Sequence, residues 1–223
     1  MPIRLLIFDL DGTLVDSFRD IVTSCNLLLG TLDAGPLADD QIRPCIGRGV
    51  RYLVECVLRQ GGVEVGDAGA LVSRYRDIYR AHALDETRLY TGVRETLTAL
   101  SETGATLAVL SNKPEDACRG MLAYFGIDRL FSRVAGGDSY SEMKPSPLPL
   151  HRIGEELARS SSETVMVGDS VYDIETGKRA GVVTVAALYG FQSPEMLKAL
   201  EPDFSVSAFS EILELPFIAT TGR

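Results

Sequence analysis

The sequence predicts an α/β fold, in which a doubly wound, mostly parallel sheet forms a core and a helical cap is inserted into it. Two observations predict this class. Short apolar segments alternate with helical segments from Thr91 onward, which is typical of a parallel sheet with helices on both faces. Between the first strand and Thr91, apolar residues follow only a helical spacing. We therefore expect a core of residues 1–15 and 91–223 and a cap of residues 16–90.

Six short apolar segments are the predicted strands of the core. They are residues 3–8, 105–110, 133–135, 164–167, 182–187 and 204–206. Helical segments at 115–125, 148–158, 172–180 and 194–200 separate most of them, and a further helix with Val93, Leu97 and Leu100 on one face precedes residue 105. In Ser146-Pro147 and Ser193-Pro194 a capping hydroxyl precedes a proline, a combination that starts helices.

Three helices are predicted in the cap, from apolar residues three and four positions apart. These residues are Phe18, Ile21, Val22, Cys25, Leu28 and Leu29, then Val50, Leu53, Val54, Val57 and Leu58, then Leu71, Val72, Tyr75, Ile78 and Tyr79. No strand is predicted in this region. An all-helical block inserted just after the first strand is expected to cover the edge of the sheet.

The composition restricts the possible partners. Hydrophobic residues make up 45% of the 223, so the chain can bury a sizeable core. The net charge is −9 and there is no long basic run, which argues against nucleic acid as a partner. The apolar run at residues 3–8 is too short for a membrane span and leads into Asp9 and Asp11, so a strand is expected there rather than a signal peptide. We expect a cytoplasmic protein without membrane contact, monomeric or homodimeric.

The four cysteines show no Cys-x-x-Cys spacing; they are Cys25, Cys45, Cys56 and Cys118. This pattern favours small apolar residues in a reducing compartment over a metal site or a set of disulfides.

The most informative segment is the end of the first strand, where Asp9 and Asp11 precede Gly12 and Thr13. A buried strand carries both carboxylates to its carboxyl end, where open α/β sheets bind ligands, and Gly12 allows a tight turn beside them. Two adjacent carboxylates repel each other, so the pair needs a cation or a shared proton. The alternative interpretation is an acidic turn that only ends the strand.

Three more polar features follow strands and are expected at the same edge. Ser111-Asn112 begins a strand-to-helix junction, where unpaired N–H groups attract anions. Lys144-Pro145 follows the strand at 133–135, and Gly168-Asp169-Ser170 with Asp173 follows the strand at 164–167. Each feature alone has a structural explanation, such as a helix cap for Ser111 or a solvated side chain for Lys144. Their occurrence together favours a phosphate site in which carboxylates bind Mg²⁺.

These segments resemble the four motifs of the haloacid dehalogenase-like hydrolase superfamily, in the same order. The matching segments are Phe8-Asp9-Leu10-Asp11-Gly12-Thr13-Leu14, Ser111-Asn112-Lys113, Lys144-Pro145, and Gly168-Asp169-Ser170 with Asp173. The resemblance covers almost the whole chain and implies a doubly wound, Rossmann-like core with an inserted helical cap.

The resemblance also implies roles for the matched residues. Asp9 is expected to be the nucleophile that accepts the phosphoryl group, and Asp11 the general acid and then the general base. Gly12, Thr13, Ser111, Asn112 and Lys144 are expected to bind the substrate. Mg²⁺ is the expected cofactor, held by Asp9, Asp169 and the backbone carbonyl of Asp11. Asp173 is expected to orient Lys144 or the metal shell.

Further segments resemble the phosphoglycolate phosphatase branch of this superfamily. They are Asp16-Ser17, Gly47-Arg48-Gly49-Val50, Ser111-Asn112-Lys113-Pro114 and Lys144-Pro145-x-Pro147. Arg48 is the cap residue expected to contact the substrate, although a solvated loop arginine is equally consistent with the sequence. The position of Lys113, in the cleft or in solvent, stays open.

The expected activity is Mg²⁺-dependent hydrolysis of a small phosphorylated metabolite, with 2-phosphoglycolate favoured, through an aspartyl-phosphate. Asp11 disfavours dehalogenation. A halide leaves without a proton, whereas an alkoxide leaving group needs one, which an acid such as Asp11 can supply. The alternatives are a pyrophosphatase, a sugar-phosphate phosphatase or phosphomutase of the same superfamily, and a non-catalytic phosphate-binding regulator.

Overall fold

The computed structural model describes residues 3–218, and these residues form two compact units. The first unit comprises the described residues up to Asp16 and those from Leu89 onward, and the second comprises Ser17–Arg88. The ends of the predicted core range, residues 1–2 and 219–223, lie outside the described residues.

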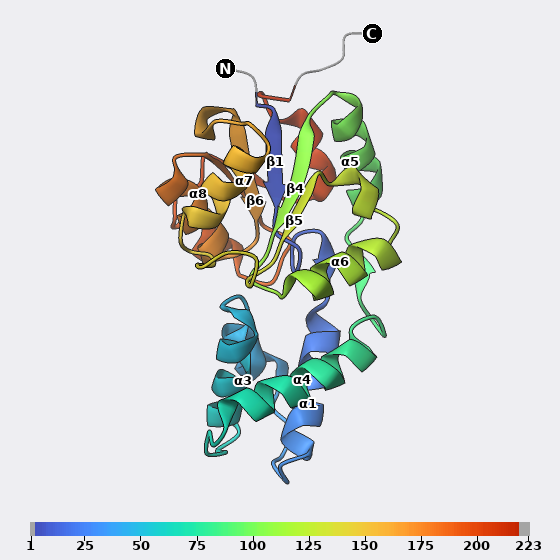
Figure 1. Cartoon of the computed structure of the whole chain (residues 1–223), viewed down its shortest axis with the longest axis vertical. Helices are drawn as coiled ribbons and strands as arrows, with labels where there is room; N and C mark the ends of the chain where they lie inside the picture. The colour runs from blue at the N-terminus through green and yellow to red at the C-terminus, as the bar shows by residue number, and fades with distance from the viewer. Residues whose placement is uncertain (1–2, 219–223) are drawn as a thin grey trace. The chain divides into compact units, whose positions relative to one another are not determined.

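The first unit is built on a six-stranded parallel sheet with the strand order β5-β4-β1-β6-β7-β8 (Figure 1). The strands are β1 (Leu5–Phe8), β4 (Thr106–Leu110), β5 (Arg133–Ala135), β6 (Thr164–Gly168), β7 (Val183–Ala187) and β8 (Phe204–Val206). Phe8 at the end of β1 pairs with Val109 of β4 and Val167 of β6. This register brings the carboxyl ends of the three central strands to one edge of the sheet, where open parallel sheets bind ligands.

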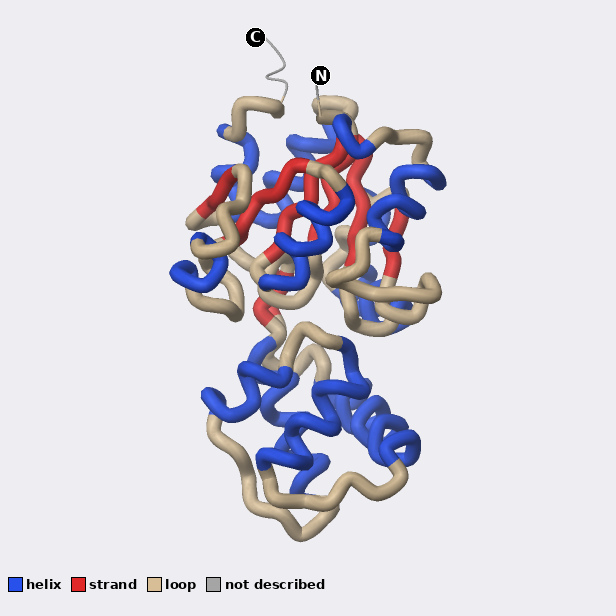
Figure 2. The backbone as a smooth tube through the Cα atoms, turned by 90° about the vertical axis from the view of Figure 1, so that its left-hand side faces the viewer, coloured by secondary structure: helices blue, strands red, loops and turns tan. Residues whose placement is uncertain are grey.

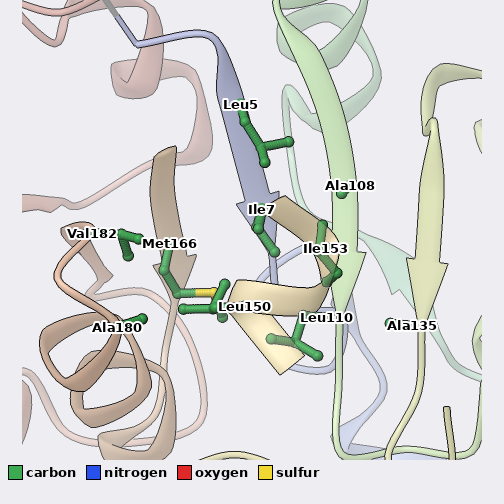
Figure 3. Close-up of a cluster of buried hydrophobic side chains, with 10 residues drawn as sticks. All are labelled: Leu5, Ile7, Ala108, Leu110, Ala135, Leu150, Ile153, Met166, Ala180 and Val182. Carbon is green, nitrogen blue, oxygen red and sulfur yellow. The ribbon is translucent and has the colours of Figure 1, made fainter. Parts of the chain in front are cut away.

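Helices cover both faces of this sheet. They are α5 (Val93–Glu102), α6 (Glu115–Tyr124), α7 (Leu148–Glu156), α8 (Val171–Ala180) and α9 (Pro194–Lys198). On one face, Leu150 and Ile153 of α7 pack with Leu5 and Ile7 of β1, and Figure 3 shows Leu150 beside Met166. Because side chains alternate along a strand, Phe8 points to the opposite face, where its ring lies 5.6 Å from that of Phe209. The sheet is therefore buried on both sides, and the α/β class predicted from the sequence is confirmed.

Each predicted core strand has a counterpart in this sheet, with ends that differ by at most two residues. Two strands were not predicted: β2 (Val15–Asp16) and β3 (Arg88–Leu89), which form a separate two-stranded sheet. Ser193 caps α9 as expected, since its hydroxyl accepts a hydrogen bond from the N–H of Met196. Helix α7 starts at Leu148, where the predicted segment begins, and Pro147 is its N-cap rather than its first helical residue.

The second unit contains only helices and loops between Ser17 and Thr87 (Figure 2). Its helices are α1 (Phe18–Gly30), α2 (Asp39–Ile42), the 3-10 helix η1 (Arg43–Cys45), α3 (Gly49–Gln60) and α4 (Ala68–His82). Tyr75 and Tyr79 of α4 are buried, as their helical spacing predicted. Their rings are stacked, with centroids 5.9 Å apart. The buried carboxylate of Asp20 accepts hydrogen bonds from the N–H groups of Glu86 and Thr87, so it joins the first helix to the end of the unit.

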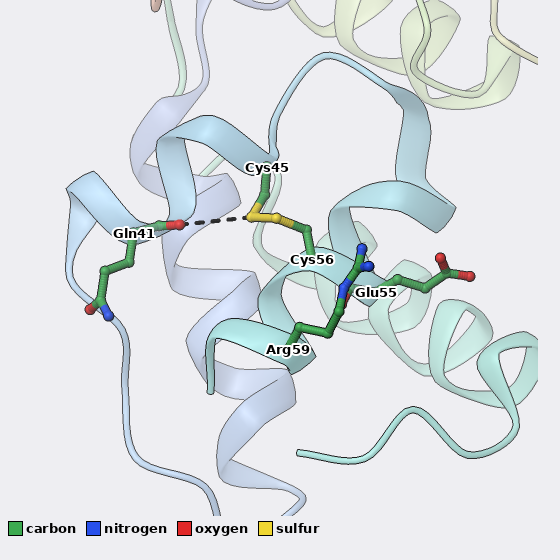
Figure 4. Close-up of a disulfide and its surroundings, with 5 residues drawn as sticks. All are labelled: Gln41, Cys45, Glu55, Cys56 and Arg59. Atoms are coloured by element: carbon green, nitrogen blue, oxygen red, sulfur yellow. Dashed lines mark hydrogen bonds between the residues drawn. A yellow bond between two sulfur atoms is a disulfide. The ribbon is translucent and has the colours of Figure 1, made fainter. Parts of the chain in front are cut away.

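The expectation of four reduced cysteines is wrong for two of them. Cys45 and Cys56 form a disulfide that joins η1 to α3, with their Cα atoms 5.6 Å apart (Figure 4). Cys25 and Cys118 are free and buried, as expected of small apolar residues. Spacing alone could not predict the bridge, because it depends on the turn at residues 46–48 that brings η1 back beside α3. Among the described residues, no helix is both long enough and apolar enough to cross a membrane.

Candidate active site

Asp9 lies directly after β1, at the carboxyl edge of the sheet. Its N–H donates to the carbonyl of Val167 at 2.9 Å, which extends the pairing with β6 by one residue. One carboxylate oxygen accepts the N–H of Leu10 at 2.7 Å. The strand thus fixes the backbone of Asp9, and the turn that follows fixes its carboxylate.

Gly12 and Thr13 form the turn beside Asp9 and pack against Asp169 from the end of β6. Gly12 has a φ of +86°, and a Cβ on it would lie 2.1 Å from the nearer carboxylate oxygen of Asp169. Only glycine fits both the backbone angle and this close approach. The hydroxyl of Thr13 donates to Asp169 at 2.9 Å. The turn after the first strand therefore positions the third acid of the site.

Lys144 is buried between two carboxylates. Its Nζ lies 3.0 Å from Asp9 and 2.6 Å from Asp173. The side-chain amide of Asn112 bonds the backbone of Lys144 twice, donating to its carbonyl and accepting from its N–H, each at 2.9 Å. The peptide bond between Lys144 and Pro145 is cis. Asn112 therefore fixes the backbone that carries the lysine.

Asp173 lies in the first turn of α8 and is fully buried. Besides Lys144, it accepts hydrogen bonds from the N–H and the hydroxyl of Ser170, at 3.0 and 2.5 Å. A Cβ at Gly168 would lie 2.2 Å from the carboxylate carbon of Asp173, so the glycine leaves room for this acid. Its partners agree with the expected role of orienting Lys144.

Burial changes the protonation of these groups. Burial raises the pKa of Asp9 to about 7, against the opposing effect of the Lys144 ammonium. Burial also raises the pKa of Asp169 well above its usual value, and the charges of Asp9 and Asp173 add to this effect. Burial alone would lower the pKa of Lys144, but the carboxylates of Asp173 and Asp9 outweigh it and hold the pKa above its ordinary value. Lys144 is therefore charged. The carboxylates around it carry more negative charge than this one ammonium neutralises.

The acidic residues fit a divalent cation. Ligand oxygens of Asp9, Asp169 and Asp173 all lie within 4.8 Å of one another, and all three residues are buried. The raised pKa values of Asp9 and Asp169 show that their charged forms lack sufficient compensation. Hard carboxylate oxygens are the ligands that Mg²⁺ prefers. The donor set and its electrostatics therefore both suit Mg²⁺.

The side chain of Asp11 pairs with a different lysine, Lys113. The Nζ of Lys113 lies 2.9 Å from each of its carboxylate oxygens, and the two side chains are only 8% and 15% exposed. The question that the sequence left open is thus answered, since Lys113 lies in the site and not in solvent. The side chain of Asp11 does not belong to the carboxylate cluster of Asp9, Asp169 and Asp173.

Ser111 is buried at the end of β4, where its N–H pairs with the carbonyl of Ala135 at 3.0 Å. Arg48 belongs to the helical unit, where its exposed guanidinium lies over the ring of Tyr52, 4.2 Å from the ring centroid. The structure therefore brings together all the predicted site residues of the first unit, whereas Arg48 lies in the other unit.

Sequence reasoning missed several residues that hold this site together. The N–H of Phe191 donates to Asp169 at 2.8 Å, and a Cβ at Gly190 would lie 2.2 Å from the Cβ of Asp169. The hydroxyl of Tyr189 donates to the carbonyl of Thr13 at 3.0 Å. All three residues follow β7, and the Gly190 after this strand was the one available signal.

The comparisons agree with this geometry. The family model described as "Haloacid dehalogenase-like hydrolase" matches residues 6–187. A phosphoglycolate phosphatase of Aquifex aeolicus is 36% identical over 216 residues, which cover 95% of this chain and 96% of that protein. One of Psychrobacter arcticus is also 36% identical, over 96% of both chains. The crystal structure of a predicted phosphoglycolate phosphatase from Haemophilus somnus superposes with a TM-score of 0.88, at 32% identity, and covers 95% of this chain and 97% of its own.

Proposed function

We propose that this chain, which belongs to the haloacid dehalogenase-like hydrolase family and is a phosphoric monoester hydrolase, acts on 2-phosphoglycolate with Mg²⁺ through an aspartyl-phosphate. The names of its relatives support the choice of substrate. The observation that carries the proposal is the position of Asp9. It lies directly after β1, with the Nζ of Lys144 3.0 Å from its carboxylate and the buried carboxylates of Asp169 and Asp173 in the same cluster.

The reaction proceeds in two steps on this arrangement. A carboxylate oxygen of Asp9 attacks phosphorus, the bond from phosphorus to the ester oxygen breaks, and Asp11 gives its proton to the leaving alkoxide. Water then attacks phosphorus and loses a proton to Asp11, and the bond to Asp9 breaks to release phosphate. Asp11 therefore ends the cycle in its starting protonation state.

Fixed positive charge lets one anion attack another. Lys144 lies 3.0 Å from Asp9, where it can also bind a phosphoryl oxygen, and phosphoryl transfer depends mostly on such charges and on positioning. Ser111, Asn112, Gly12 and Thr13 are assigned to the remaining substrate contacts. Asp9 and Asp169 would hold Mg²⁺ with the backbone carbonyl of Asp11, because Asp173 is already bonded to Lys144 and Ser170. Bound there, Mg²⁺ would neutralise charge on the phosphoryl group.

The helical unit is proposed to be a cap that excludes water and selects the substrate. Arg48 is its candidate for the carboxylate of 2-phosphoglycolate, since a guanidinium can form two parallel hydrogen bonds with a carboxylate. Gly47 and Gly49 on either side have φ values of +106° and +81°, and the Arg48 side chain between them is exposed at the start of α3. The cap is proposed to span residues 16–90.

A substrate panel tests this proposal. Phosphate release is measured with 2-phosphoglycolate, pyrophosphate, hexose phosphates and nucleoside monophosphates, each with Mg²⁺ and with a chelator. We expect 2-phosphoglycolate to have the highest kcat/KM, the chelator to abolish turnover, and Asp9→Asn to be inactive on every substrate. A higher kcat/KM on another ester would identify that ester as the substrate. Transfer of phosphate between sugar hydroxyls would indicate a mutase. Turnover by Asp9→Asn would exclude the covalent route.

The proposed surroundings follow from this substrate. A small phosphorylated metabolite is expected in the cytoplasm, so the enzyme is placed there, as a monomer or homodimer. The disulfide between Cys45 and Cys56 points instead to a more oxidising compartment. Cell fractionation with antibody detection, followed by light scattering of the purified protein, tests both parts.

A further inference from the structure

We propose that Lys113 is the positioning residue of Asp11, and that it acts on the reaction through that carboxylate and not through the phosphoryl group. The inference rests on the proposed function, because it assigns to Asp11 the proton that the leaving group receives. It goes further in naming the cation that sets the orientation of Asp11.

The contact is short and symmetric. Lys113 Nζ lies 2.9 Å from both carboxylate oxygens of Asp11, and both side chains are largely buried. Charge-assisted hydrogen bonds of this kind are stronger than neutral ones, and they restrict the rotation of the carboxylate. Without the ammonium, the Asp11 side chain would lose both of these contacts and would turn toward other donors.

The two lysines of the site have different acids. Lys144 contacts Asp9 and Asp173, and Lys113 contacts Asp11. The nucleophile and the proposed acid are only two residues apart and would otherwise compete for one cation. With a lysine each, the two carboxylates are held independently of each other.

The backbone of Lys113 is fixed more firmly than an ordinary loop residue. Its carbonyl accepts the N–H of Gly137 at 2.9 Å, and its own N–H lies 3.4 Å from the hydroxyl oxygen of Ser111. A Cβ at Gly136 would lie 2.6 Å from the carbonyl oxygen of Lys113, and one at Gly137 would lie 2.5 Å from that of Asn112. Two glycines after β5 therefore let one loop pack directly on the backbone that carries the lysine.

The competing role for Lys113 is direct binding of a phosphoryl oxygen. The two roles differ in their dependence on the leaving group. A lysine that binds the phosphoryl group stabilises every phosphate ester alike. A lysine that positions Asp11 matters most when the leaving group is a strong base and needs its proton, as an alkoxide does, and least for p-nitrophenolate.

The experiment measures kcat/KM for a series of esters from p-nitrophenyl phosphate through phenyl phosphate to ethyl phosphate and 2-phosphoglycolate. The ratio kcat/KM reports the first chemical step, in which the leaving group departs, whatever the rate of the later hydrolysis. The proteins are the wild type, Lys113→Met, Lys113→Arg, Asp11→Asn and the double variant Asp11→Asn/Lys113→Met. Lys178→Met is the matched control, because Lys178 is exposed on α8 and bonds only a carbonyl, that of Leu200, in the described contacts.

We expect Lys113→Met to lose about 100-fold in kcat/KM on the alkyl esters, the lower end of what general acid catalysis contributes, and less than about 10-fold on p-nitrophenyl phosphate. Lys113→Arg should recover part of the loss, and Lys178→Met should match the wild type. In the double variant, the lysine change should add nothing to the loss from Asp11→Asn. Thermal unfolding by circular dichroism confirms that each variant is folded.

The opposite results are equally clear. A loss of the same size on every ester, or a further loss in the double variant, overturns the positioning role and assigns Lys113 to the phosphoryl group. Unchanged kinetics in Lys113→Met overturns it as well. In each of these cases the wild type still hydrolyses alkyl esters and the proposed function stands, whereas a wild type inactive on all esters overturns both.

Discussion

The side-chain amide of Asn112 bonds both backbone polar groups of Lys144, each at 2.9 Å. The residue therefore takes part in the site through a neighbour, since its amide fixes the segment that carries the buried ammonium. Sequence reasoning placed Asn112 at this edge because it follows a strand. It could not predict the partner, because the contact joins two loops 32 residues apart.

The first prediction concerns Asn112→Ala. The change leaves two backbone groups of Lys144 without partners, so the free energy of unfolding should fall by about 2 to 4 kcal/mol. Because Lys144 then loses its fixed position, kcat should fall as well, by about 10-fold or more. Urea unfolding and steady-state kinetics measure the two effects.

Asn26 provides a matched control. In the helical unit it forms the same pair of bonds with the backbone of Leu37, at 3.1 and 2.8 Å. Asn26→Ala should lower stability to a similar degree and leave kcat close to that of the wild type. Equal losses of kcat in the two variants would show that Asn112 acts only through stability.

The second prediction concerns the buried thiols and pH. Burial raises the pKa of the Cys25 thiol from its ordinary value of 9.0 to about 12, and it raises that of Cys118 further. Between these values the folded protein keeps protons that the unfolded chain releases, so stability should fall as pH rises above about 9. Unfolding midpoints at pH 8, 9 and 10 measure the slope, which should be shallower in Cys25→Ala. A slope that Cys25→Ala leaves unchanged contradicts the prediction.

At the scale of elements, the disulfide holds a part of the helical unit that is made of short helices. The helix α2 has four residues and η1 has three, so neither buries much surface by itself. The bridge from Cys45 to Cys56 ties these elements to the longer α3. A covalent link of this kind restricts the unfolded chain and so favours the folded state.

The third prediction is that reduction of this bridge lowers the free energy of unfolding. Closing a loop of about 11 residues corresponds to about 3 kcal/mol in the chain-entropy model. Urea unfolding with and without dithiothreitol gives the difference. The double variant Cys45→Ala/Cys56→Ala should resemble the reduced protein and show no further response to reductant. A response that persists in the variant would have to come from another source.

The elements also show what the sequence could predict. The six core strands were found because each is an apolar run next to turn or helix signals, and β6 is buried throughout. The strands β2 and β3 have two residues each, too few to show an alternating pattern. The site residues after β1, β4 and β6 could be predicted because each follows a strand, and the carboxyl ends of parallel strands share one edge of the sheet. Contacts between loops, such as Lys113 with Asp11 and Phe191 with Asp169, depend on turn conformations, which the spacing of apolar residues does not predict.

At the scale of the whole molecule, the sheet order decides which loops meet. β1 lies between β4 and β6, so the segments after these strands converge although they are about 100 and 160 residues from Asp9 in the chain. Burial raises the pKa values of Asp9 and Asp169, and repulsion from the other acids of the cluster raises them further. The fold therefore keeps an unfavourable charge cluster that a cation would relieve.

The fourth prediction follows from this charge cluster. Mg²⁺ binds the folded arrangement and has no comparable site in the unfolded chain, so it should stabilise the protein by about 2.7 kcal/mol at 100 times its Kd. Differential scanning calorimetry over a range of Mg²⁺ concentrations measures the shift in Tm. Hydrogen exchange should slow around Asp9 and Asp169 in the same range, since these residues are the proposed ligands.

Asp169→Asn and Asp203→Asn distinguish this site from general ionic effects. The carboxylate of Asp203 also accepts two hydrogen bonds, from the N–H and hydroxyl of Thr184 at 2.8 Å each, but it does not belong to the acidic cluster. Asp169→Asn should abolish the Mg²⁺-dependent shift in Tm, and Asp203→Asn should retain it. If Mg²⁺ raised the Tm of both variants equally, the stabilising site would lie elsewhere. Loss of the shift in Asp169→Asn alone would place the cation in the cluster that Asp169 forms with Asp9 and Asp173.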